Sequence, residues 1–69
     1  MKEVNLHGHS HYDVRDVVES YVLMNDAPFR IIADKSEQVR VVLETVLKKH
    51  KLRYNTTVDN TSRTVSVGQ

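Results

Sequence analysis

Three alternating histidines stand near the start of the chain, and their side chains suggest chemistry. They are His7, His9 and His11 in the segment VNLHGHSHYDVRDVV, residues 4 to 18. Imidazole acts as a general acid or base near neutral pH, and it also binds Zn²⁺ and Ni²⁺. The segment is therefore a candidate for a catalytic site, for a metal site, or for a turn that joins a strand to a helix.

A metal site would require the three rings to share one face of a continuous strand. Gly8 and the helix-capping residue Ser10 instead predict that the chain turns here, which would separate the rings. The sequence has no cysteine, and no carboxylate is well placed to complete a coordination sphere. We therefore expect no specific metal site, and His7 is the candidate for proton transfer, with His9 as a second such group.

A second polar group, Ala33-Asp34-Lys35-Ser36, follows the next apolar run of the sequence. Lys35 can bind a phosphate as a point charge. Asp34 can supply a carboxylate for proton transfer, or it can cap the helix that follows, and we favour the cap. Ser36 is the other candidate for that cap.

The apolar periodicities predict the elements that must position these residues. Residues 3 to 7 alternate as in a half-buried strand. Ser10 and Asp13 form a capping-box pattern before a helix that residues 25 to 28 end at Pro28. Residues 29 to 33 read as a second strand, and a second helix follows, with Lys48 and Lys49 at its carboxyl end. Its apolar stripe consists of Val39, Val42, Leu43, Val46, Leu47 and His50.

The last part of the sequence, LRYNTTVDNTSRTVSV, alternates on both sides of residues 59 to 62 and predicts a β-hairpin. The expected fold is a two-layer α/β sandwich of order β-α-β-α-β-β, a single domain over residues 1 to 69. We expect right-handed crossovers, parallel pairing of the first strands and one antiparallel strand that closes the sheet. Two helices can cover only one face of this mixed sheet. The residues expected on the helix side are Val4, Leu6, Tyr54, Val58, Val65 and Val67, and those expected on the open side are Asn5, Arg30, Arg53, Asn55, Thr57, Thr64 and Ser66.

This fold predicts that the two polar groups meet. Ligand sites of sheets with parallel strands lie beyond the carboxyl ends of those strands, where the amino ends of helices offer unpaired N–H groups. His7-Gly8-His9 ends the first strand, and residues 33 to 36 end the second. We therefore expect a phosphate-binding edge that contains His7, Gly8, Lys35 and Ser36.

The sequence resembles a known family at these residues. VNLHGHSHYDVRDVV, followed by FRIIADKSEQVRVVLETVLKKH, is similar to the small MutS-related (Smr) domain, which has an LDxH-G segment after its first strand and an HGxG-type loop before its second helix. The resemblance covers nearly the whole chain in element order. It implies a fold similar to the carboxy-terminal domain of bacterial translation initiation factor three. It also implies binding, and often cleavage, of DNA or RNA.

The sequence differs from the family pattern at several positions. Val4 and Asn5 stand where the family has leucine and aspartate, while His7 and Gly8 are kept. Residues 33 to 36 lack the family's histidine and both glycines. Because asparagine is not a general base, these differences favour a domain that binds nucleic acid with a degraded nuclease motif.

Charge is unevenly distributed along the chain, although the net charge is only +1. Residues 1 to 34 carry three Lys or Arg and six Asp or Glu, whereas residues 35 to 69 carry seven and three. A basic half is a candidate footprint for nucleic-acid phosphates. The expected contacts beyond the phosphate-binding edge are Asn5, Arg30, Lys48, Lys49, Lys51 and Arg53.

Three functions remain open from the sequence. The first is binding of RNA or DNA without efficient cleavage, which we favour. The second is cleavage by an Smr-type endonuclease in which His7 acts with Asp34 or His9. A domain that only binds nucleic acid is expected to need no cofactor, whereas for a nuclease Mg²⁺ is the candidate metal. The third is a protein-interaction or inhibitor module that uses the acids of the first helix, Asp13, Asp16 and Glu19.

The sequence also bears on location. It contains no cysteine for disulfides and no apolar stretch of the length that a signal peptide or a membrane span needs. We therefore expect a cytoplasmic protein with no membrane partner.

Overall fold

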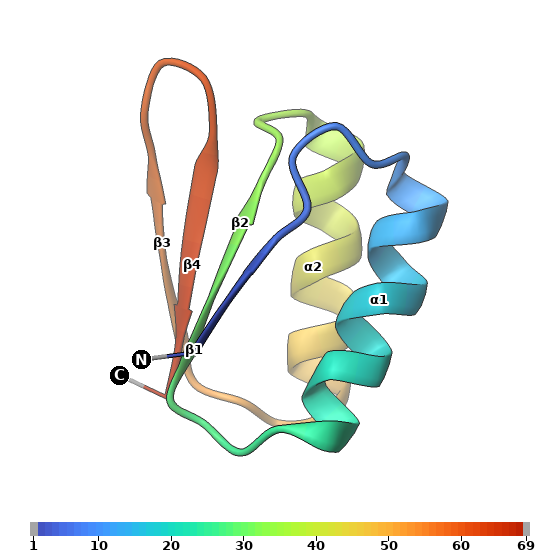
Figure 1. Cartoon of the computed structure of the whole chain (residues 1–69), viewed down its shortest axis with the longest axis vertical. Coiled ribbons are helices and arrows are strands. Elements are labelled where there is room, and N and C mark those ends of the chain that lie inside the picture. Colours follow the sequence, from blue (N-terminus) through green and yellow to red (C-terminus); the bar gives the residue numbers. More distant parts are fainter. Residues whose placement is uncertain (1, 69) are drawn as a thin grey trace.

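The computed structural model describes residues 2 to 68, and its elements follow the predicted order β-α-β-α-β-β (Figure 1). The elements are β1 (Lys2–Asn5), α1 (His11–Met24), β2 (Phe29–Ala33), α2 (Glu37–Lys49), β3 (Tyr54–Val58) and β4 (Arg63–Val67). Both helices cover the same face of the sheet, and the other face is open. The predicted two-layer α/β fold is confirmed.

The four strands form one mixed sheet in the order β1-β2-β4-β3. Strands β1 and β2 pair in parallel, and β4 pairs antiparallel with both β2 and β3. The antiparallel strand therefore lies inside the sheet, and β3 forms one of its edges. Because β1, β2 and β3 run in the same direction, the loops that follow them meet at one end of the molecule, at the top of Figure 1. We call this the loop end; it comprises residues 6 to 10, 34 to 36 and 59 to 62.

The two helices begin where their caps predict. Ser10 Oγ accepts a hydrogen bond of 3.2 Å from the Asp13 N–H, and Ser36 Oγ accepts one of 3.2 Å from the Val39 N–H. These bonds satisfy N–H groups that have no partner inside the helix. No helix within residues 2 to 68 is long and apolar enough to cross a membrane.

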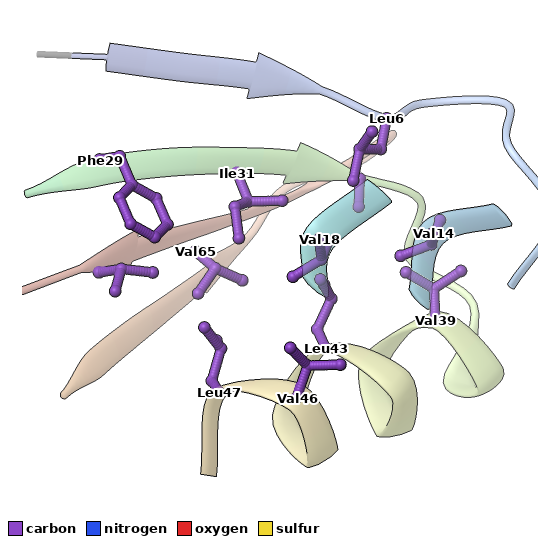
Figure 2. Close-up of a cluster of buried hydrophobic side chains, with 12 residues drawn as sticks. Leu6, Val14, Val18, Phe29, Ile31, Val39, Leu43, Val46, Leu47 and Val65 are labelled. Atoms are coloured by element: carbon purple, nitrogen blue, oxygen red, sulfur yellow. The ribbon is translucent and has the colours of Figure 1, made fainter. Parts of the chain in front are cut away.

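The core lies between the sheet and the helices (Figure 2). The predicted stripe of α2 supplies four of its buried residues, and Val14 and Val18 supply the contribution of α1. The Tyr21 ring meets the Phe29 ring edge to face, with centroids 5.1 Å apart. Burial of each large apolar side chain stabilises the fold by about 1.5–3 kcal/mol, so these residues fix how the helices sit on the sheet. The fully enclosed positions are Leu6, Val14, Val18, Phe29, Ile31, Ala33, Val39, Leu43, Val46, Leu47, Val65 and Val67.

The predicted division of strand residues between the two faces is confirmed, Val58 included. Leu6, Val65 and Val67 are buried, and Val4 and Tyr54 are partly buried against the core. Val58 lies opposite the buried Arg63 and so on the expected helix side, but it is 50% exposed. The reason is that β3 forms an edge of the sheet, and among its residues only Tyr54 packs against the core.

Candidate functional site

The β1–α1 loop places His7 at the loop end. Asn5 Oδ1 accepts the His7 N–H at 2.9 Å, and the Leu6 carbonyl accepts the His9 N–H at 3.1 Å. Gly8 has φ +91°, a conformation that glycine adopts at little cost, as the predicted turn requires. The turn leaves His7, Gly8 and His9 exposed.

The His7 side chain faces residues from both of the other loops. Its Nε2 atom lies 3.0 Å from the Thr61 carbonyl oxygen and 3.3 Å from Asp34 Oδ1. Both neighbours accept hydrogen bonds, so Nε2 carries the proton in this arrangement. When the ring is neutral, the lone pair is therefore on Nδ1, and Nδ1 is the atom that can accept a proton.

Asp34 does not cap α2, contrary to the role we favoured from the sequence. Ser36 is the N-cap, whereas Asp34 Oδ1 accepts the Gly8 N–H at 3.1 Å in addition to facing His7. The reason lies in the spacing, because Ser36 directly precedes the first helical residue, Glu37, whereas Asp34 lies three residues before Glu37. Asp34 is instead a carboxylate that lies beside His7.

Lys35 binds the same hairpin turn as His7. Its Nζ atom donates to the Asn60 carbonyl at 3.0 Å, next along the chain from the Thr61 carbonyl that faces His7. Lys35 and Ser36 are exposed. The loop end therefore brings His7, Gly8, Asp34, Lys35 and Ser36 together, as the topology predicted.

Arg63 holds the β2–α2 loop in place, and sequence reasoning missed it. It is 6% exposed, and its guanidinium donates to the Lys35 carbonyl at 2.9 Å and to the Asp34 carbonyl at 3.4 Å. The available signal was the alternation of residues 63, 65 and 67, which assigns Arg63 to the buried face of the strand. A charged residue at such a position requires polar partners.

Asp59 organises the hairpin turn that carries these carbonyl groups. Its Oδ1 atom accepts the N–H groups of Thr61 at 2.9 Å and Ser62 at 2.8 Å. These backbone hydrogen bonds lower the pKa of the Asp59 carboxyl, and the positive charge of Lys35 lowers it further. The turn was predicted from the sequence, but its contribution to the site was not.

Arg40, on the first turns of α2, is already occupied. Its guanidinium pairs with Glu37, three residues before it, and with Glu44 at 3.0 Å. The hydrogen bond from Arg40 lowers the pKa of Glu37, and both carboxylates raise the pKa of Arg40. Arg40 is therefore not a free cation for a ligand at the loop end.

The remaining expected binding residues lie away from the loop end. Lys48, Lys49, Lys51 and Arg53 follow or end α2, whose 13 residues span about 20 Å, so they lie at the opposite end of the molecule (Figure 1). Arg30 lies on the open face of the sheet, 3.4 Å from Glu3.

The acids of α1 do not form a free cluster. Glu19 Oε1 accepts from Lys49 Nζ at 2.7 Å, and Glu19 Oε2 lies 3.5 Å from His50 Nε2. The bond from Lys49 is the main cause of a lowered pKa of Glu19. This contact joins α1 to α2, so it withdraws Glu19 from the expected acidic face and Lys49 from the expected basic one. Asp13 and Asp16 remain exposed.

Within residues 2 to 68, no group of three or more His, Cys, Asp or Glu side chains is arranged to hold a metal ion. At the loop end, His7 and Asp34 together offer only two potential metal ligands. The His11 ring packs instead against Tyr12, with ring centroids 4.1 Å apart.

Comparison of the chain with protein-family models, with curated proteins and with solved structures gave no match.

Proposed function

We propose that the loop end binds a phosphate of a nucleic-acid backbone, and that the protein is an Smr-like nucleic-acid-binding domain. One observation carries the proposal: the Gly8 N–H and His7 Nε2 both face the same carboxylate oxygen of Asp34, at 3.1 and 3.3 Å. These two groups form a seat for an anionic oxygen, which we call the anion seat. A phosphate oxygen has the same charge and hydrogen-bonding needs as this carboxylate oxygen.

The surroundings of the anion seat favour a phosphate. Lys35 is exposed in the neighbouring loop, and its Nζ atom has only the Asn60 carbonyl as its bonded partner in residues 2 to 68. Both helices begin next to the seat, at Ser10 and Ser36, and the amino end of a helix attracts anions. The Leu6-His7-Gly8 segment, which resembles the Smr motif, contributes the seat itself.

The test of this proposal is binding to labelled oligonucleotides. Fluorescence anisotropy would be measured with single- and double-stranded DNA and RNA, for the parent and for His7→Ala and Lys35→Ala. Lys48→Ala is the matched control, because it removes the same charge as Lys35→Ala from the last turn of α2, the end of that helix away from the loop end. We expect the two loop-end variants to weaken binding and the control to leave it nearly unchanged. Equal losses from Lys35→Ala and Lys48→Ala, or no binding by the parent, would contradict the proposal.

The contact between His7 and Asp34 favours a second candidate function, cleavage of a phosphodiester. With Nε2 held toward Asp34 and Thr61, Nδ1 of a neutral His7 can take a proton from the attacking hydroxyl or water. His9 lies two residues away on the same loop and is the candidate to protonate the leaving oxygen. We rank this function below binding, because Asn5 and residues 33 to 36 depart from the residues of the nuclease pattern.

Cleavage is tested by a gel assay on the same oligonucleotides, with and without Mg²⁺. If the nuclease motif is degraded, His7→Ala hardly changes a weak or absent cleavage, because catalytic groups act as a unit. Rebuilding the family residues with Asn5→Asp, Ala33→His, Asp34→Gly and Ser36→Gly should then raise cleavage, since a well-placed proton-transfer group contributes ~10²- to 10⁴-fold. Strong cleavage by the parent that His7→Ala abolishes would instead establish the second function.

A further inference from the structure

The outer edge of β3 is unprotected. Strand β3 lies at the end of the sheet order, and its residues 55 to 58 are all exposed. Its sequence, YNTTV, contains no charge and no proline, and its pairing with β4 is regular, without a bulge. Edge strands usually carry a charged residue, a proline or a β-bulge, because these features prevent pairing with another chain. By contrast, the edge strand β1 carries the charged residues Lys2 and Glu3.

The hydrogen bonds of the hairpin show which backbone groups are available at this edge. The Gly68 N–H donates to the Arg53 carbonyl at 2.7 Å, and the Asp59 N–H donates to the Ser62 carbonyl at 3.0 Å. Bonded and non-bonded pairs alternate along an antiparallel ladder, so the odd-numbered residues of this strand bond to β4. The N–H and C=O groups of Tyr54, Thr56 and Val58 therefore point away from the sheet.

We propose that β3 pairs antiparallel with β3 of a second copy, with Thr56 opposite Thr56 at the twofold axis. This register places Tyr54 opposite Val58 and Asn55 opposite Thr57. The outward-pointing groups of Tyr54, Thr56 and Val58 then face each other and form hydrogen-bonded pairs, each exchanging two bonds. The two sheets become one continuous sheet.

The side chains of this register complement each other. Aromatic–β-branched pairs and threonine pairs are among the favourable cross-strand neighbours, and Tyr54–Val58 and Thr56–Thr56 are such pairs. Val58, which is 50% exposed, is covered by Tyr54 of the second copy. Among the large exposed hydrophobics of residues 2 to 68, Val58 is the one that lies in a strand, and this contact covers it.

The charges at the two ends of the strand also fit this register. Arg53 lies opposite Asp59 of the second copy, on both sides of the twofold axis. Arg53 has no ion pair within residues 2 to 68, and the hydrogen bonds that Asp59 accepts favour its ionised form. Two oppositely charged pairs therefore flank the uncharged strand and specify a second copy over an arbitrary extended peptide.

This dimer has a consequence for the proposed phosphate site. Because the strands run in opposite directions, Lys51 and Arg53 of one copy approach the hairpin turn of the other, which borders its anion seat. The basic residues that lie at opposite ends of one chain are thereby brought together across two. This consequence depends on the proposed function, whereas the dimer itself does not.

The dimer is tested by sedimentation velocity and by light scattering after size exclusion, over a series of concentrations up to about 1 mM, since a contact through one strand edge is small. The parent should approach twice the chain mass of 8.0 kDa as concentration rises. Thr56→Lys, which places two like charges opposite each other, should remain at the monomer mass. Ser20→Lys adds the same charge on α1 and should behave as the parent. Circular dichroism of each variant checks that it is folded.

Charge reversal provides a second test that does not depend on Thr56. Arg53→Asp faces Asp59 of the second copy with a like charge and should shift the monomer–dimer midpoint to higher concentration, whereas Arg53→Lys should largely keep it. Added salt should weaken the parent dimer. A parent that stays monomeric throughout, or a dimer that neither Thr56→Lys nor Arg53→Asp weakens, would overturn the proposal. A parent that forms the dimer but binds no oligonucleotide would overturn the proposed function alone.

Discussion

At the loop end, Asp34 uses one carboxylate oxygen for two contacts, the Gly8 N–H and His7 Nε2. This oxygen occupies the anion seat that the proposed function assigns to phosphate. An incoming phosphate must therefore displace Asp34 or share the seat with it, and two negative charges at this separation repel each other. Under the proposed function, Asp34 is thus the residue expected to set how strongly an anion binds here.

Replacing Asp34 by alanine should tighten the binding of a phosphate. At about 4 Å in water, two unit charges interact by about 1 kcal/mol, so we expect about fivefold tighter binding of an oligonucleotide by anisotropy. Asp26→Ala removes the same charge from the α1–β2 loop and serves as the control. Weaker binding by Asp34→Ala would instead mean that Asp34 positions His7 for the ligand.

The two glycines with positive φ should respond differently to alanine. A Cβ atom at Gly8 meets nothing within 4 Å, so Gly8→Ala should cost only the backbone strain of about 1–2 kcal/mol in the free energy of unfolding. A Cβ atom at Gly68 would lie 2.5 Å from Ala27 Cβ, so Gly68→Ala should be more destabilising. Urea denaturation of both variants gives the comparison, and an equal cost would show that the contact at Gly68 relaxes freely.

Among the elements, the β3–β4 hairpin contributes most to the arrangement of the site. Its turn supplies the carbonyl groups that face His7 and Lys35, and β4 supplies Arg63, which fixes the β2–α2 loop. Asp59 holds the turn by accepting two backbone N–H groups. The hairpin thus determines where side chains from two other loops lie.

Changing Asp59 to asparagine should reduce stability in a pH-dependent way. The pKa of Asp59 is lower in the folded chain, so its ionised form stabilises the fold above the pKa of the unfolded chain, about 3.9. That contribution is lost as the pH falls through the folded pKa. Thermal unfolding should therefore show the parent more stable than Asp59→Asn at pH 7, with the difference shrinking below pH 4. A difference independent of pH would mean that the charge of Asp59 has no part in it.

Removing the guanidinium of Arg63 should loosen the β2–α2 loop. Arg63→Ala leaves the Asp34 and Lys35 carbonyl groups without their donor and empties a buried position, so we expect a loss of about 2–3 kcal/mol in denaturant unfolding. Arg40→Ala removes an arginine from α2 whose side chain is 36% exposed, and it should cost less. Comparable losses for both variants would show that the buried hydrogen bonds of Arg63 stabilise the fold no more than the surface ion pairs of Arg40.

At the scale of the whole molecule, the lysines expected to bind nucleic acid are divided between two ends. Lys35 lies at the loop end, whereas Lys48, Lys51 and Arg53 lie near the carboxyl end of α2 (Figure 1). A single chain therefore offers an oligonucleotide two separate charged regions. The dependence of affinity on salt concentration distinguishes which of the two regions contacts the oligonucleotide.

The salt dependence of binding should be shallow and should depend on the loop end. Each neutralised phosphate contributes a slope of about −0.7 for a single strand or −0.9 for a duplex to log affinity against log salt. Lys35→Ala should reduce the slope by about one such unit, and Lys48→Ala should not, when measured on monomer at low concentration. A slope near zero in the parent would end the nucleic-acid proposal and favour the protein-interaction alternative.

The sequence by itself determined the elements, their order and the faces of the sheet. These follow from local causes: the caps at Ser10 and Ser36, the stop at Pro28, and apolar periods that assign Leu43, Leu47 and Val65 to the core. It also predicted that the loops after β1 and β2 meet, because parallel strands end at one edge. Lys35 and Ser36 were placed beside His7 for this reason.

Only the tertiary structure decided which atoms meet. The place of β4 between β2 and β3 brings the hairpin turn next to His7, and no local pattern fixes that order of strands. The buried anchor Arg63 and the exposure of Val58 both follow from it, because β4 is next to β2 and β3 is left at an edge. The role of Asp34 depends on Gly8, which lies 26 residues before it in the chain. The division of the lysines expected to bind nucleic acid between two ends likewise follows from the length of α2, which carries its last turn away from the loop end.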